Sequence, residues 1–218
     1  LFRSGRIKEP DEPMTHWAML IDIRHCIGCK TCILACSQAN EVPEGAWRKI
    51  SELEEPSLPD RRRHFLTRAC MHCENPPCLP VCPTTATHRR VDGIVAVDSE
   101  KCVGCGACIL ACPYDARVLD TPRHDFEAGT ARDERRRGTC TKCHFCIPRI
   151  EKGLAQGLKP GVDPEATPLC VVTCCTGALH FGDLDDPGSH VSAMIEHHPS
   201  IRLAEASGTN PSVYYILD

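Results

Sequence analysis

The chain has 218 residues, a formal charge of −4 and 18 cysteines. The negative charge argues against a nucleic-acid surface, and no apolar run approaches the ~18–20 residues that span a bilayer. Only five Phe, three Tyr and two Trp are present. Side-chain packing is therefore a limited source of stability, to which bound metal would add because its binding free energy becomes folding free energy.

The first predicted element is a strand over the apolar run AMLIDI at 18–23. It precedes CIGCKTCILAC at 26–36, whose spacing is C-x2-C-x2-C-x3-C. A second predicted strand, IVAV at 94–97, precedes CVGCGACILAC at 102–112, which has the same spacing 76 residues later. These two cysteine copies, the first and the third in chain order, form an internal repeat.

Two looser copies have the same opening and the same close. The second copy, residues 70–82, reads CMHCENPPCLPVC, and the fourth opens with CTKC at 140–143 and closes after 26 residues with CVVTC at 170–174. This spacing predicts tight loops that turn three thiolates toward one iron–sulfur cluster, while the fourth cysteine starts a helix and reaches the other cluster of a pair. Pro83 and Pro113 suit the first position of such a helix.

Zinc and disulfides are the alternatives for so many cysteines. A zinc site favours two C-x2-C pairs around one tetrahedral ion, and it requires neither a third cysteine nor a C-x3-C close. Disulfides impose no such regular spacing and mostly staple shorter chains. The four copies therefore favour iron–sulfur cofactors, and sixteen of the 18 cysteines would hold four 4Fe–4S clusters.

Two cysteines of the fourth copy have a competitor. The close C-x3-C selects Cys174 as the ligand, and Cys175 is then expected to be a small buried thiol. Cys146 follows Cys143 at ferredoxin spacing and is an alternative ligand to Cys170. Cys170 is preferred because the C-x3-C close recurs in every copy.

With these motifs the chain resembles the four-cluster iron–sulfur (beta) subunits of molybdenum or tungsten oxidoreductases of the dimethyl-sulfoxide reductase and polysulfide reductase type. The resemblance extends to NEVPEGAWR at 40–48, to 68–86 around the second copy, and to GTNPSVYYI at 208–216. It implies an α+β fold of two ferredoxin-like 2×(4Fe–4S) modules with long loops. The implied parts are an outer module of residues 14–66 and 138–184, an inner module of residues 67–137, and a C-terminal docking tail of residues 185–218.

The resemblance also implies how the cysteines are shared. The first and fourth copies would form the outer module and the second and third copies the inner one. The implied ligand sets are Cys26, Cys29 and Cys32 with Cys174; Cys140, Cys143 and Cys170 with Cys36; Cys70, Cys73 and Cys78 with Cys112; and Cys102, Cys105 and Cys108 with Cys82. No catalytic residue is expected, because every recognisable site is a closed set of four thiolates.

We therefore expect a non-catalytic subunit that conducts electrons through four 4Fe–4S clusters. By resemblance its partners are a catalytic subunit with a molybdenum or tungsten bis-pterin cofactor and a membrane anchor subunit linked to quinone, or another carrier. The implied location is cytoplasmic and peripheral to the membrane through these partners, with the periplasmic side as the alternative. The competing hypotheses are a stand-alone polyferredoxin or hydrogenase-linked carrier and, from another class, a zinc-stabilised interaction module.

Several residues near the loops have more than one interpretation. Lys30, Lys101 and Lys142 lie in or beside cluster loops, where each either raises a cluster potential or is a solvated surface lysine. His72 is expected to pack or to form hydrogen bonds, because its loop already has enough cysteines. The span 144–169 predicts either a partner-facing helix and loop or a solvated insertion.

Overall fold

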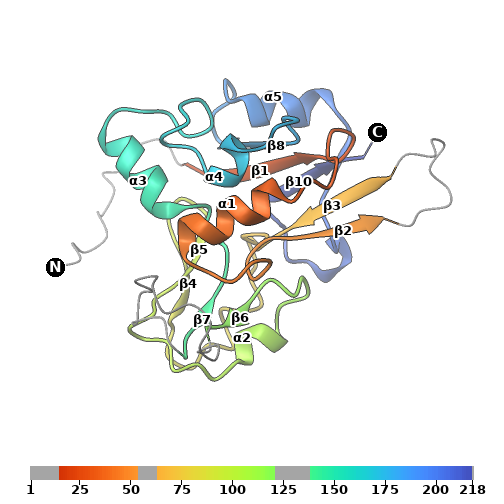
Figure 1. Cartoon of the computed structure of the whole chain (residues 1–218). Helices are drawn as coiled ribbons and strands as arrows, with labels where there is room; N and C mark the ends of the chain where they lie inside the picture. The colour runs from red at the N-terminus through yellow and green to blue at the C-terminus, as the bar shows by residue number, and fades with distance from the viewer. Residues whose placement is uncertain (1–14, 54–62, 121–137, 218) are drawn as a thin grey trace.

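The computed structural model describes residues 15–53, 63–120 and 138–217, and it combines short strands with short helices (Figure 1). The strands are β1 (Trp17–Asp22), β2 (Lys49–Leu53), β3 (His64–Arg68), β4 (Thr87–Arg89), β5 (Val95–Val97), β6 (Val118–Leu119), β7 (Cys140–Thr141), β8 (Leu179–Asp183), β9 (Ser200–Ile201) and β10 (Val213–Ile216). The helices are α1 (Thr31–Asn40), α2 (Ala107–Leu110), α3 (Ile147–Ala155), α4 (Leu169–Val172), α5 (His190–His197) and the 3-10 helix η2 (Glu205–Ser207).

The largest sheet has the strand order β8–β1–β10–β9. β1 pairs antiparallel with β8 and parallel with β10, so segments far apart in the sequence meet on either side of it. All six residues of β1 are buried. A strand that is covered on both faces has a continuous apolar sequence rather than an alternating one, which explains WAMLI.

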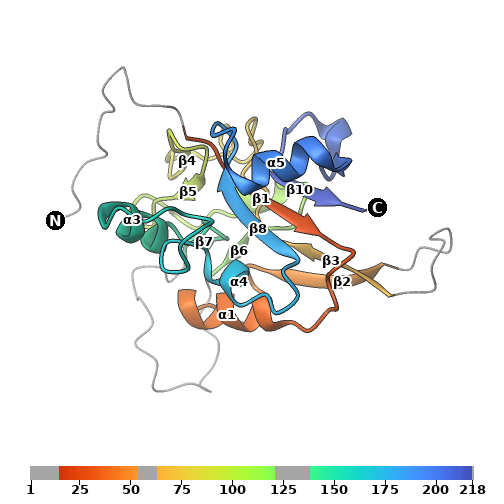
Figure 2. The same cartoon turned by 90° about the horizontal axis from the view of Figure 1, so that it is seen from above.

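Alternate residues of β1 face two different cores. Ala18 and Leu20 pack against Val191 of α5, which lies across β8 and β1 when the molecule is seen from above (Figure 2). Met19 and Ile21 face a larger core that also contains many of the cysteines. Because β1 precedes the first cysteine copy and β8 follows the fourth, their pairing holds these two copies side by side.

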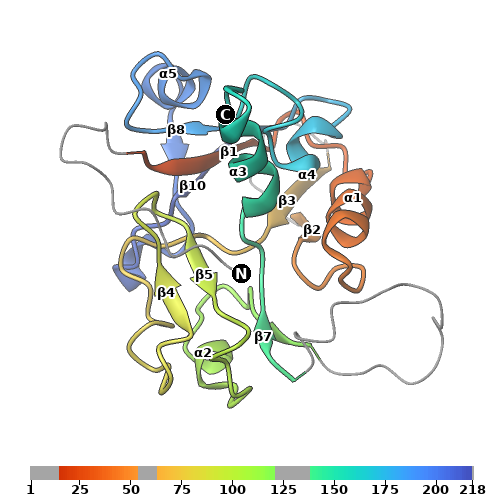
Figure 3. The ribbon, with the colours of Figure 1, turned by 90° about the vertical axis from the view of Figure 1, so that its left-hand side faces the viewer.

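The remaining strands form three antiparallel hairpins, β2–β3, β4–β5 and β6–β7. Figures 1 and 3 show β4, β5, β6, β7 and α2 grouped apart from the four-stranded sheet. The second and third cysteine copies lie in this group. The grouping supports two modules, although the boundaries implied by the resemblance remain a prediction.

The strands expected before the first and third copies are present as β1 and β5, but the expected helix starts are wrong. α1 begins at Thr31, before Cys36, and α2 ends at Leu110, before Cys112. Pro113 follows in a turn. Proline has no N–H and disfavours a helical conformation in the preceding residue, so here it ends the helix rather than beginning one.

The implied docking tail contributes to the fold of the protein itself. The Ser189 side chain caps α5 by accepting a hydrogen bond from the N–H of Ser192 at 3.1 Å. β10 lies between β1 and β9, and its fully buried Tyr215 donates a hydrogen bond to the carbonyl of Thr67 at 3.0 Å. A docking role for this tail therefore remains a prediction beside an observed structural role.

Candidate metal centres

The first three cysteine copies open with the same tight loop. The residue before the second cysteine has a left-handed backbone, with φ of 69° at Gly28, 44° at His72 and 67° at Gly104. This conformation curls the chain so that cysteines and backbone N–H groups can face one side. At Gly104 the approach is very close, because a Cβ there would lie 2.0 Å from the carbonyl oxygen of Gly138.

The fourth copy has this loop three residues later than the sequence analysis predicted. Phe145, directly before Cys146, has φ of 54°, whereas Lys142, directly before Cys143, has no positive φ. Non-glycine residues rarely adopt this conformation, so its recurrence at the same loop position is informative. Cys143 and Cys146 therefore form the C-x2-C loop of this copy, and Cys140 belongs to β7 before it.

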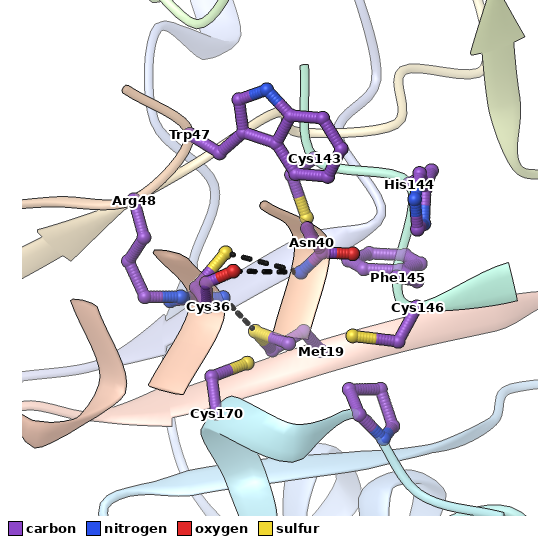
Figure 4. A pocket seen from close by; sticks show the side chains of 11 residues that line it. Met19, Cys36, Asn40, Trp47, Arg48, Cys143, His144, Phe145, Cys146 and Cys170 are labelled. Atoms are coloured by element: carbon purple, nitrogen blue, oxygen red, sulfur yellow. Dashed lines mark hydrogen bonds between the residues drawn. The ribbon is translucent and has the colours of Figure 1, made fainter. Parts of the chain in front are cut away.

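Four thiols surround one pocket between α1, the fourth loop and α4. They belong to Cys36, Cys143, Cys146 and Cys170, and Figure 4 shows their Sγ atoms directed into the same space. Burial raises the pKa of Cys36 to about 12; Arg48 opposes this shift, and Cys170 and Cys146 add to it. Since the thiolate is the ligand form, metal binding would have to offset the cost of deprotonating such a buried thiol.

Cys140, which the sequence analysis placed in the fourth set, does not line this pocket. It pairs with Leu119 across the β6–β7 hairpin, and this pairing carries it toward the third copy. Its N–H donates to Sγ of Cys102 at 3.3 Å. The hydrogen bond with Cys140 is also the main reason why the pKa of Cys108 falls to about 5.

The third copy and the close of the second copy share another pocket. Its cysteines are Cys82, Cys102, Cys105 and Cys108, with Cys140 as a fifth. The structure thus brings together the set implied for the third cluster. It also adds one thiol that neither the spacing nor the resemblance assigns there.

The cysteines of the second copy lie near Cys112 of the third. Burial raises the pKa of Cys73 to about 12, and the nearby thiols of Cys70, Cys78 and Cys112 add to the shift. The guanidinium of Arg117 donates to Sγ of Cys78 at 3.0 Å. This is the arrangement implied for the second set.

The cysteines of the first copy lie near the close of the fourth. Burial raises the pKa of Cys32 to about 11, and the thiols of Cys174 and Cys26 contribute. Sγ of Cys29 lies 4.0 Å from Sγ of Cys175. The expectation that Cys175 is buried is wrong, because its side chain is exposed beside this site.

The surroundings of these four cysteine assemblies fit iron–sulfur clusters. Backbone N–H groups reach the sulfur of two closing cysteines, from Thr87 to Cys82 at 3.4 Å and from Ala178 to Cys174 at 3.2 Å. Nε and Nη1 of the buried Arg48 have no hydrogen-bond partner within the described residues. A negatively charged cluster would offset the cost of burying this cation, so the surroundings fit. The names are group 1 (Cys26, Cys29, Cys32, Cys174), group 2 (Cys70, Cys73, Cys78, Cys112), group 3 (Cys82, Cys102, Cys105, Cys108) and group 4 (Cys36, Cys143, Cys146, Cys170).

The cysteine spacing and these neighbouring thiols are typical of an iron–sulfur protein, and comparison with known proteins shows its family. Residues 62–184 match the 4Fe-4S dicluster domain. The sequence is 39% identical over 209 residues to the B subunit of tetrathionate reductase from Salmonella typhimurium, a match that covers 94% of this chain and 73% of that protein. It is 42% identical over 220 residues to the iron-sulfur B subunit of a putative dimethyl sulfoxide reductase from Halobacterium salinarum, covering 93% and 79%.

A third relative is the B component of polysulfide reductase from Wolinella succinogenes, 36% identical over 203 residues and covering 92% of this chain and 93% of that protein. The chain thus belongs to this family of iron–sulfur reductase subunits, as the resemblance implied. Its cofactors are therefore 4Fe–4S clusters and its activity is electron transfer. The family favours this over the zinc alternative.

Proposed function

We propose that four 4Fe–4S clusters bind to this protein, one in each of groups 1 to 4, and that it conducts electrons between two partner subunits without catalysing a reaction itself. The observation that carries the proposal is that the four thiols of group 4, with Cys146 in place of Cys140, line one pocket and those of group 3 line another. Neighbouring thiols of groups 1 and 2 support the other two sites. When bound, such clusters exchange single electrons. The proposed modules keep the implied ranges, with groups 1 and 4 in the outer module and groups 2 and 3 in the inner one.

Contacts within each module support two neighbouring pairs of clusters. In the outer module, Cys32 of group 1 lies near enough to Cys170 of group 4 for their charges to interact. In the inner module, Arg117 contacts Cys78 of group 2 at 3.0 Å and also lies near Cys108 of group 3. Electrons would therefore pass between groups 1 and 4 and between groups 2 and 3.

A ring contact supports the step between the two modules. His72 lies in the C-x2-C loop of group 2, and Phe145 lies in that of group 4. Their ring centroids are 3.8 Å apart, and both side chains are almost fully buried. This dry contact between two cluster loops supports the order group 1, group 4, group 2, group 3.

The two ends of this proposed series reach the surface. Cys29 of group 1 and Cys105 of group 3 are exposed. Their loop neighbours Ile27 and Val103 are 60% and 66% exposed, so each end presents an apolar side chain at the surface. Exposed apolar patches of this kind favour docking of partners.

The relatives' names supply the class of partner. They are subunits of tetrathionate, dimethyl sulfoxide and polysulfide reductases. We infer that one partner is a catalytic subunit with a molybdenum or tungsten bis-pterin cofactor and that the other is a membrane anchor or another carrier. In residues 15–53, 63–120 and 138–217, every helix is too short or too polar to cross a bilayer. We propose a peripheral, cytoplasmic location through these partners.

Purification of the native complex tests this function. About sixteen irons and sixteen sulfides per chain, absorption near ~400 nm that bleaches on reduction, and co-migration with a pterin-containing subunit are expected. A lone small iron–sulfur species would favour the stand-alone carrier, and a hydrogenase partner would favour the hydrogenase-linked one. Bound zinc without iron would refute the proposal.

A further inference from the structure

Two buried arginines lie beside the cysteine groups, and the function proposed above gives their charge no role. Arg48 is 1% exposed and Arg117 is 2% exposed. Arginines are almost never fully buried unless they are paired. Among the described residues no carboxylate forms an ion pair with either of them. Within the described part of the chain, the negative partners left to them are the thiolates and what the thiolates bind.

Arg48 lies beside the outer pair of groups. Nη2 donates to Sδ of Met19 at 3.2 Å, while Nε and Nη1 have no partner in the described residues. The thiols near enough to interact with its charge include Cys32 of group 1, and Cys36 and Cys170 of group 4. Figure 4 shows it next to Cys36 at the edge of the group 4 pocket.

Arg117 has the corresponding place between the inner pair of groups. Nη2 donates to Sγ of Cys78 in group 2 at 3.0 Å. Nη1 donates to Oγ1 of Thr87 at 3.2 Å and approaches Sγ of Cys140 at 3.7 Å. Cys108 of group 3 is also near enough to interact with its charge. Each arginine thus contacts or adjoins thiols of two different groups.

We propose that the two arginines set the reduction potentials of the clusters in pairs, Arg48 for groups 1 and 4 and Arg117 for groups 2 and 3. This inference rests on the proposed four-cluster function. Reduction makes a cluster more negative, so a nearby fixed cation stabilises the reduced form and raises the potential. Screening is weak in the interior, which lets one guanidinium act on both clusters of its pair.

The sharing of one cation has a consequence for conduction. A charge beside a single cluster would hold the electron there, whereas a charge between two clusters raises both potentials together. The electron then moves between neighbours of similar potential. Lys101, whose side chain is 64% exposed beside the third copy, lacks this effect because water and salt screen it.

A potentiometric titration followed by EPR, on the intact complex, tests the proposal. The variants are Arg48→Gln, Arg117→Gln, the charge-keeping Arg48→Lys, and Lys101→Gln as the exposed control, each with iron and sulfide counted. Arg48→Gln should keep its clusters and lower two of the four midpoint potentials. The expected shift is at least about 59 mV for a one-electron couple, which is a tenfold change in the ratio of reduced to oxidised cluster. Arg117→Gln should lower the other two midpoint potentials. Arg48→Lys keeps the positive charge, so its midpoint potentials should stay close to those of the unaltered protein.

The outcomes separate this inference from a packing role and from the proposed function. The inference would be overturned if both glutamine variants kept all their clusters and showed unchanged midpoint potentials. It would also be overturned if Arg48→Gln and Arg117→Gln shifted the same two midpoint potentials. If Arg48→Gln loses iron, Arg117→Gln still tests the inference, with Lys101→Gln as its control. Arg117→Gln must lower two midpoint potentials, and Lys101→Gln must lower none. Fewer than four clusters in the unaltered protein would instead refute the proposed function.

Discussion

The first and third cysteine copies have the same spacing and nearly the same residues, yet they build different structures. In the first copy, residues 26–36, the ten-residue helix α1 begins at Thr31 and extends beyond the last cysteine. The third copy, residues 102–112, contains only the four-residue helix α2, which ends before its last cysteine. The first copy is followed by Ser37 and the third by Pro113. The cysteine spacing thus determines the loop, and the residue that follows it determines how far the helix extends.

The two loops also differ in what surrounds them. A Cβ at Gly28 would meet the ring of Phe65 at 2.6 Å, and a side chain can rotate away. A Cβ at Gly104 would meet the backbone carbonyl of Gly138 at 2.0 Å, which cannot move without distorting the chain. The same glycine position is therefore more constrained in the third copy.

The largest effect is expected for Gly104→Ala. A left-handed alanine costs roughly 1–2 kcal/mol, and the backbone clash adds to this cost. We expect iron to fall by about one cluster per chain, as measured by iron and sulfide analysis. Gly28→Ala should lose less, and Phe65→Ala added to it should recover part of that loss. Equal losses in the two glycine variants would contradict this account of the loops.

Ser37→Pro would make the first copy resemble the third. Proline inside a helix costs about 3 kcal/mol or more, because it removes a hydrogen bond and clashes with the preceding turn. The end of α1 would also lose the bonds from Asn40 to the carbonyl and Sγ of Cys36, at 2.9 and 3.7 Å. We expect a lower thermal midpoint, with Pro113→Ala as the control that changes it little. An unchanged midpoint in Ser37→Pro would show that the helix extension has no structural role.

A smaller effect is expected at the aspartates that precede the two loops. Asp22 is 1% exposed, and its carboxylate accepts hydrogen bonds from Nε and Nη2 of Arg24 at 2.8 and 2.7 Å. Burial would raise the pKa of Asp22, but the bonds and charge of Arg24 hold it below its usual value. Asp98 instead faces Lys101, which is largely exposed. Asp22→Asn should therefore cost about 2 kcal/mol at pH 7, and Asp98→Asn less than about 1 kcal/mol.

The pH dependence follows from the direction of the shift. A carboxyl with a lowered folded pKa adds stability above its unfolded pKa of about 3.9, and this stability is lost as the pH falls through the folded value. The difference in unfolding midpoint between the unaltered protein and Asp22→Asn should thus shrink below about pH 4. A difference that grows on acidification would contradict the assignment.

The cysteine spacing was sufficient to predict the cofactor, whereas the resemblance implied how the copies share their cysteines. Three of the implied sets are those of groups 1 to 3. In the fourth, Cys146 lines the pocket and Cys140 does not, and CTKCHFC at 140–146 fits either register. One sequence signal favours the later register, because a lysine precedes the first cysteine in both Lys101–Cys102 and Lys142–Cys143. The left-handed backbone at Phe145 was visible only in the structure.

Other features depend on contacts that no local pattern contains. The pairing of β1 with β10 joins Met19 to Val213, and the sequence marks neither as the other's neighbour. The burial of Arg48 and Arg117 likewise follows from how distant segments close around them. No sequence motif marks either arginine as a neighbour of the cysteines, so their place beside the cysteine groups emerged only from the structure.

The most direct test of the account is the iron content of two matched variants, Cys146→Ser and Cys140→Ser, each purified with its partners. We expect Cys146→Ser to lose or convert one cluster, leaving about twelve to fifteen irons, while Cys140→Ser keeps about sixteen. Loss of a cluster with Cys140 and full content without Cys146 would contradict the proposed fourth site.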